Sequence, residues 1–149
     1  MNRSPLAAAL TLVLLALAPA ARAADSKVGR HDAAEAGPVS SFDGTTWKVT
    51  LVPERAAIDR GEKMIDDTLA FADGKMTSSA CTSHGFDASA VASGGKSGRL
   101  HFTTTQESAK EGRTRWQARA KGNMLLGTMF WTRPDGSVTA YQFRGSQQK

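Results

Sequence analysis

Residues 113–132 have the sequence RTRWQARAKGNMLLGTMFWT, two runs of strand-forming residues separated by a turn signal at Lys121-Gly122-Asn123. In the first run, apolar and charged residues alternate with a period of two, which places the two kinds on opposite faces of a strand. One face holds Trp116, Ala118 and Ala120, and the other holds Arg113, Arg115, Gln117, Arg119 and Lys121. The stretch therefore predicts a β-hairpin with one buried apolar face and one solvent-exposed polar face.

The same pattern of short strand-forming runs separated by turn signals continues in both directions, from Gly44 to Gly145. Apolar alternation predicts eight strands, at Thr45–Val52, Ile65–Phe71, Lys75–Ala80, Phe86–Ala92, Arg99–Gln106, Arg113–Lys121, Asn123–Thr132 and Val138–Arg144. The links are too short for crossover helices, so neighbouring strands must be antiparallel. Gly94–Gly98 is interpreted as a loose connection, and Pro53–Arg60 as a short helix or an irregular lid.

Eight consecutive antiparallel strands leave two exposed edges unless the last strand pairs with the first. We therefore expect one all-β domain, an eight-stranded antiparallel up-and-down barrel. Two packed sheets would show the same alternation. Pairing of the strand that contains Trp47 with the strand that contains Arg144 would distinguish the barrel from the sandwich.

The N-terminal residues have the pattern of a secretory signal peptide. Arg3 precedes an apolar run, Leu6–Ala18, and a small-x-small cleavage site at Ala21-Arg22-Ala23. We expect residues 1–23 to be the signal, 24–42 a flexible leader and 43–149 the barrel. The protein should then be exported, to a periplasm or outside the cell, without a membrane anchor.

Charge and cysteine content restrict the chemistry only weakly. The formal net charge is +5, and removal of Arg3 and Arg22 leaves about +3, which selects no partner. The single cysteine, Cys81, excludes an intramolecular disulfide and lies too far from the cleavage site to carry a lipid. We expect a monomer without a cofactor.

Two short segments resemble the calycin superfamily of lipocalins and avidins. They are Gly44-Thr45-Thr46-Trp47 at the first strand and Tyr141-Gln142-Phe143-Arg144-Gly145 on the last. The resemblance implies a lipocalin-like barrel that binds a small apolar molecule, with Arg144 packed across the Trp47 indole as a structural latch. This chain has one extra residue between Gly44 and Trp47 compared with that pattern.

The leading functional hypothesis is a non-enzymatic exported protein that holds a small apolar or amphipathic ligand inside the barrel. The residues expected to line that interior site are Phe71, Ala88, Ala90, Phe102, Trp116, Ala118 and Phe130. The alternative is a barrel whose small residues let its walls pack solid. Such a protein would act as an envelope or extracellular interaction module and bind a protein or an anionic polymer through its outer surface.

The outer surface offers one charged feature, a stripe at Arg113, Arg115, Arg119 and Lys121. Alternate residues of one strand are about 7 Å apart, so this stripe could meet the phosphates or sulfates of an anionic ligand. It could equally be a solvated face that pairs with acids such as Glu107 and Glu111. Nucleic acid is disfavoured because aromatic residues are not interleaved with the stripe.

Cys81, His84 and Asp87 are the residues that most resemble reactive chemistry, a thiol close to a base and an acid. A strand end rarely supplies the pocket and oxyanion donors that acyl transfer needs, and two nearby ligands are too few for zinc. We therefore expect no catalytic and no metal site.

Overall fold

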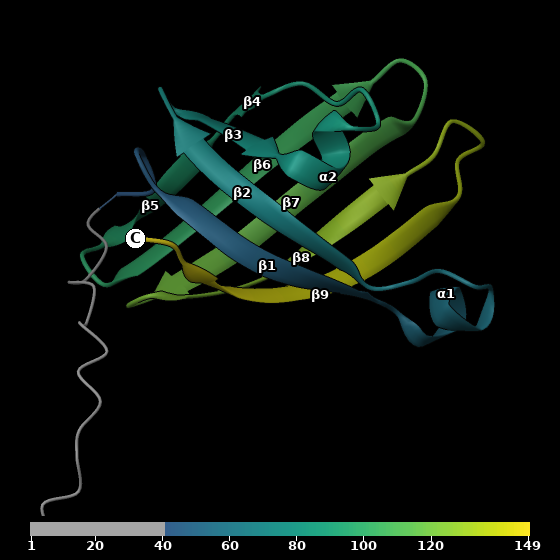
Figure 1. Ribbon diagram of the computed structural model, residues 1–149. Helices are drawn as coiled ribbons and strands as arrows, with labels where there is room; N and C mark the ends of the chain where they lie inside the picture. Colours follow the sequence, from purple (N-terminus) through teal and green to yellow (C-terminus); the bar gives the residue numbers. More distant parts are fainter. Residues whose placement is uncertain (1–40) are drawn as a thin grey trace, which may run out of the picture. The chain divides into compact units, whose positions relative to one another are not determined.

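The computed structural model describes residues 41–149, so the predicted signal peptide and residues 24–40 of the predicted leader lie outside the described part. The described chain forms strands and two short helices (Figure 1). The elements are β1 (Thr46–Pro53), α1 (Arg55–Asp59), β2 (Ile65–Ala72), β3 (Lys75–Ser78), α2 (Ser79–Thr82), β4 (Ser89–Ala90), β5 (Ala92–Lys96), β6 (Arg99–Ser108), β7 (Gly112–Lys121), β8 (Met124–Thr132) and β9 (Val138–Gln147).

All the strands belong to one 9-stranded antiparallel sheet, with the order β4-β3-β2-β1-β9-β8-β7-β6-β5. The first long strand pairs with the last, and Thr50 of β1 lies opposite Arg144 of β9. This pairing confirms the prediction of a barrel rather than two packed sheets. The predicted short helix after the first strand is also present, as α1.

The two edges of the sheet, β4 and β5, are joined by the chain itself, since only Val91 separates them. β4 pairs with β3, and β5 pairs with β6. The hydroxyl of Thr104 in β6 donates a hydrogen bond of 2.7 Å to the carbonyl of Ala90 in β4. The sheet thus curls into a nearly closed barrel (Figure 1).

The prediction of eight strands is wrong by one, because the segment expected as the fourth strand and the following glycine-rich loop form β4 and β5 instead. Glycine is required in β5 by its close neighbours. A Cβ on Gly95 would collide with the backbone carbonyl of Arg99, and Gly95 has a φ of +116°. A strand built on glycine carries no apolar alternation, so the pattern does not reveal it.

The strand predicted at Lys75–Ala80 ends early because its last residues turn into α2. The Ser78 side chain caps this helix by accepting a hydrogen bond of 3.0 Å from the Cys81 amide. The buried Asp67 carboxylate of β2 accepts a second one, of 2.9 Å, from the Ala80 amide. Two oxygen acceptors therefore satisfy amides that a strand would have paired.

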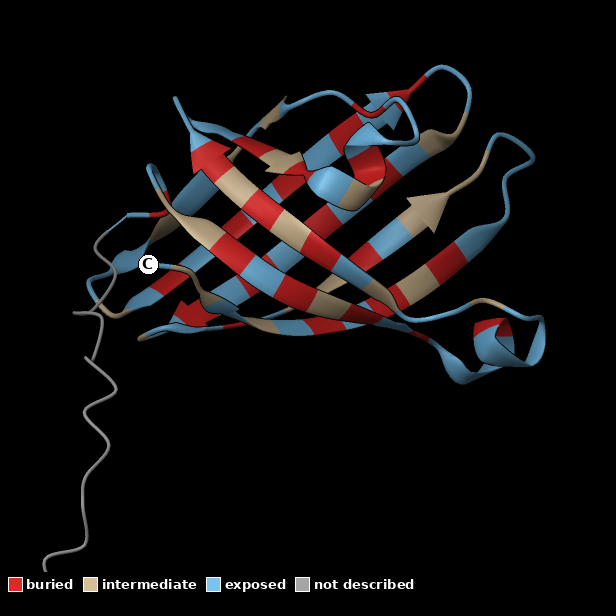
Figure 2. Ribbon diagram, viewed as in Figure 1, coloured by how far each residue is buried: buried red, intermediate tan, exposed pale blue. Residues whose placement is uncertain are grey.

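Buried and exposed residues alternate along the long strands, which Figure 2 shows as red and blue bands. The core is aromatic near the start of β1, where Phe42 packs inside. Its ring centroid is 5.0 Å from that of Phe71 and 5.1 Å from that of Phe102. Phe42 was expected in the leader, but the structure buries it to 3% exposure. The chain before β1 thus fills the barrel at this end.

Candidate functional site

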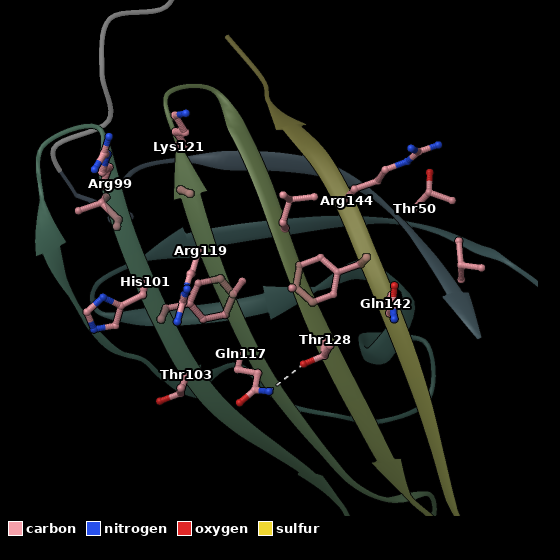
Figure 3. A pocket seen from close by; sticks show the side chains of 18 residues that line it. Thr50, Arg99, His101, Thr103, Gln117, Arg119, Lys121, Thr128, Gln142 and Arg144 are labelled. Atoms are coloured by element: carbon pink, nitrogen blue, oxygen red, sulfur yellow. Dashed lines mark hydrogen bonds between the residues drawn. The ribbon is translucent and has the colours of Figure 1, made fainter. Parts of the chain in front are cut away.

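A hollow of about 1200 Å³ lies on the outer face of the barrel. It extends over β6, β7, β8 and β9 to the neighbouring edge of β1 (Figure 3). Its outward-facing lining consists of Thr50, Val52, Arg99, His101, Thr103, Gln117, Arg119, Lys121, Leu126, Thr128, Gln142 and Arg144. The sequence pattern predicts a pocket only in the barrel interior and does not indicate this site.

The charged residues that line the hollow are all basic. They are Arg99, Arg119, Lys121 and Arg144, and His101 lies beside them. The lining contains no Asp or Glu. Within residues 41–149, the recorded salt bridges join Arg55 to Asp59 and Arg133 to Glu62, so the cations of the hollow form none.

A carboxylate lies beside the hollow at its β1 rim. The hydroxyl of Thr50 donates a hydrogen bond of 2.8 Å to Asp66, which points outward from β2. Opposite this rim, His101 and Arg119 are cross-strand partners on β6 and β7. The electrostatic field over the hollow is therefore positive and weakly compensated.

The strand register places an apolar side chain among these cations. Leu126 of β8 lies opposite Arg119 of β7 on one side and opposite Arg144 of β9 on the other. Its side chain is 54% exposed. The Phe143 ring packs directly against the next residue, Gly127, where a Cβ would lie 2.5 Å from that ring.

The structure divides the residues predicted to line an interior ligand site. Phe71, Phe102, Trp116 and Ala118 are buried inside the barrel. Ala88, Ala90 and Phe130 are exposed. Ala88 lies before β4, which is only two residues long, and Ala90 lies in β4 opposite the exposed Lys75. Phe130 is exposed because β8 turns Leu125 and Met129 inward instead.

The structure does not bring the two residues of the predicted latch together. Trp47 is fully buried inside the barrel, whereas Arg144 is exposed on the outer face of β9. A cation–π contact of the expected kind occurs elsewhere, where the Arg133 guanidinium lies 4.5 Å from the Trp131 ring centroid. Arg133 also pairs with Glu62 and donates a hydrogen bond of 2.7 Å to Thr139.

The predicted basic stripe is present on the outer face of β7, where all four side chains are exposed. Only Arg119 and Lys121 line the hollow, whereas Arg113 and Arg115 lie farther along the strand. The predicted pairing with acids is not recorded among the described residues, although Glu107 is the cross-strand partner of Arg113. The other cations of the hollow come from β6 and β9, and no local sequence pattern places them beside β7.

The cysteine and histidine near the end of β3 differ in their exposure. Cys81 is buried, and this burial, together with the charge of Asp67, raises the pKa of its thiol to about 11 despite hydrogen bonding to Ser78 and Thr114. His84 is exposed, and its ring centroid is 5.9 Å from that of Trp131. A thiol with a pKa this high stays protonated at neutral pH and is a poor nucleophile.

Residues 41–149 hold no group of three or more side chains arranged to bind a metal. Within this same range, no helix has the length and hydropathy needed to cross a membrane. Comparisons with models of protein families, with curated proteins and with solved structures gave no match. The function of the protein is therefore inferred from the fold and from the geometry of the hollow.

Proposed function

We propose that this protein is an exported, non-enzymatic binding module that holds an anionic ligand in the hollow on the outer face of its barrel. The observation that carries this proposal is the composition of the hollow, which is lined by four Arg or Lys side chains and no Asp or Glu. Exposed arginines are well suited to phosphate, sulfate and carboxylate groups because the planar guanidinium binds them with two parallel hydrogen bonds.

The packing of the interior supports an outer site over an interior one. Phe42, Phe71 and Phe102 are in mutual aromatic contact, each ring centroid about 5 Å from the next. Three of the residues expected to line an internal cavity lie outside it. Under this proposal, the resemblance to lipocalins and avidins extends only to the barrel architecture. The ligand binds on the outer face rather than in the interior site that the resemblance implies. Export rests on the sequence of residues 1–23 alone.

Charge reversal within β7 tests the proposal, because the strand offers a matched pair of residues. Arg119 lines the hollow and Arg115 does not, although both are exposed on the same face. Their separation is four residues, about 14 Å along a strand. Arg119→Glu should weaken the binding of heparin or inorganic polyphosphate at least tenfold, since it replaces an attraction by a repulsion in one site.

Arg115→Glu has the same net charge and should retain most of the affinity. Binding is measured by isothermal titration at low and high salt, and the melting temperatures of both variants should match that of the unmodified protein. Equal losses in the two variants would indicate a diffuse electrostatic effect and would contradict a defined site. Absence of binding to every anion tested would also reject the proposal.

A further inference from the structure

The outer face of β8 exposes more apolar surface than a site for a hydrated anion needs. Met124 is 57% exposed, Leu126 is 54% exposed and Phe130 is 36% exposed. All three point outward from one strand, and only Thr128 interrupts the series. Contiguous exposed apolar residues mark a binding surface more often than isolated ones do.

The neighbouring strands place cations on both sides of this apolar stripe. Leu126 has Arg119 and Arg144 as its two cross-strand neighbours, and Met124 has Lys121 on the β7 side. Adjacent strands are about 4.8 Å apart, so the Cα atoms of Arg119 and Arg144 are separated by about 10 Å. Two arginine side chains can span that distance to reach one phosphate group.

Figure 3 shows the two arginines pointing away from each other, Arg119 on the side of His101 and Arg144 on the side of Thr50. Neither is tied down by a recorded ion pair within the described residues. Exposed side chains change rotamer within nanoseconds, so both can turn toward a ligand seated over Leu126.

We propose that the hollow binds a single amphiphilic molecule with a phosphate head group, which Arg119 and Arg144 hold while its apolar chain covers Leu126. This inference rests on the proposed function, because it identifies the class of anion bound in the same hollow. The volume of about 1200 Å³ is somewhat above the roughly 300–1,000 Å³ of typical small-molecule sites, so the hollow has room for one such molecule. A concave site of that size fits one molecule better than the flat surface of a bilayer, and a hydrated polyanion would leave Leu126 uncovered.

The test is isothermal titration of the full mature protein with three probes. Dodecyl phosphate, kept below its critical micelle concentration, carries both the head group and the chain. Inorganic phosphate carries only the anion, and dodecyl maltoside carries only the chain. We expect dodecyl phosphate to bind at least tenfold more tightly than either of the other two.

Two variants in the hollow should each weaken the binding of dodecyl phosphate, and each has a matched control. Leu126→Ser should lower the affinity about fivefold, because a half-exposed leucine loses its contact with the chain. Val138→Ser, which alters a 50% exposed residue of β9 outside the hollow, should leave it unchanged. Arg119→Gln should lower the affinity about tenfold, and Arg115→Gln should have little effect.

The outcomes separate this inference from the broader proposal. Equal affinities for inorganic phosphate and dodecyl phosphate would contradict the binding of an amphiphile and leave an anion site. The same conclusion would follow if heparin binds and dodecyl phosphate does not. Binding to vesicles of anionic phospholipid, but not to monomeric dodecyl phosphate, would overturn it in favour of a membrane surface. If no anion binds at all, both proposals fail.

Discussion

At the scale of single residues, the buried thiol of Cys81 makes stability depend on pH. Burial raises the pKa of this thiol from 9.0 to about 11. Between those values the unfolded chain releases the proton and the folded chain keeps it, so the free energy of unfolding should fall as the pH rises. The fall that Cys81 causes should approach 1.4 kcal/mol per pH unit at most, about the value of one pKa unit.

Cys81→Ala should therefore show a shallower loss of stability between pH 9 and 11 in urea denaturation, and no change in slope below pH 9. Some loss should persist in the variant above pH 10, because burial and the adjacent Glu62 raise the pKa of Tyr141 to about 12. If the variant and the unmodified protein decline in parallel, the thiol does not titrate in the expected range.

At the scale of elements, Arg133 ties the β8–β9 hairpin to the loop that follows α1. It pairs with Glu62 of that loop, bonds to Thr139 and covers Trp131, while remaining only 27% exposed. Arg133→Ala removes the cationic partner of the half-buried Glu62 carboxylate and leaves it the Tyr141 hydroxyl, which should lower the free energy of unfolding by about 1–3 kcal/mol.

The matched control for Arg133 is Arg55→Ala, since Arg55 also forms a salt bridge but is 87% exposed. Breaking an exposed pair should cost less than about 0.5 kcal/mol. Chemical denaturation of both variants at neutral pH measures the difference. Similar losses would mean that the Arg133 network adds nothing beyond an ordinary surface ion pair.

Elements with strict alternation could be predicted from the sequence, whereas those specified by tertiary contacts could not. β6 and β7 follow their alternating residues closely, because one face of each is buried over its whole length. β5 depends on the close approach of Gly95 to the backbone carbonyl of Arg99, and α2 depends on capping by Asp67 from another strand. The hollow was missed for the same reason, since Arg119 and Arg144 become neighbours of Leu126 only through the register of three strands.

At the scale of the whole molecule, the barrel is closed differently at the two ends of β1. At the Trp47 end, the ring of Phe42 enters the aromatic core, with its centroid 6.1 Å from that of Trp47. At the Pro53 end, β1 pairs with Tyr141, whose hydroxyl donates a hydrogen bond of 3.2 Å to Glu62. An apolar plug therefore fills one end and a polar network covers the other.

The plug provides a test of whether the interior has room for a ligand. Phe42→Ala should lower the free energy of unfolding by about 3–5 kcal/mol and leave an apolar cavity of benzene size. Phe130→Ala removes the same ring from the outer face, where it is 36% exposed, and should cost much less. Benzene should then raise the melting temperature of Phe42→Ala, because a ligand that binds only the folded state stabilises it, and it should leave the unmodified protein unchanged. A rise in the unmodified protein would instead reveal space already present inside the barrel, and would favour an internal ligand over the outer hollow.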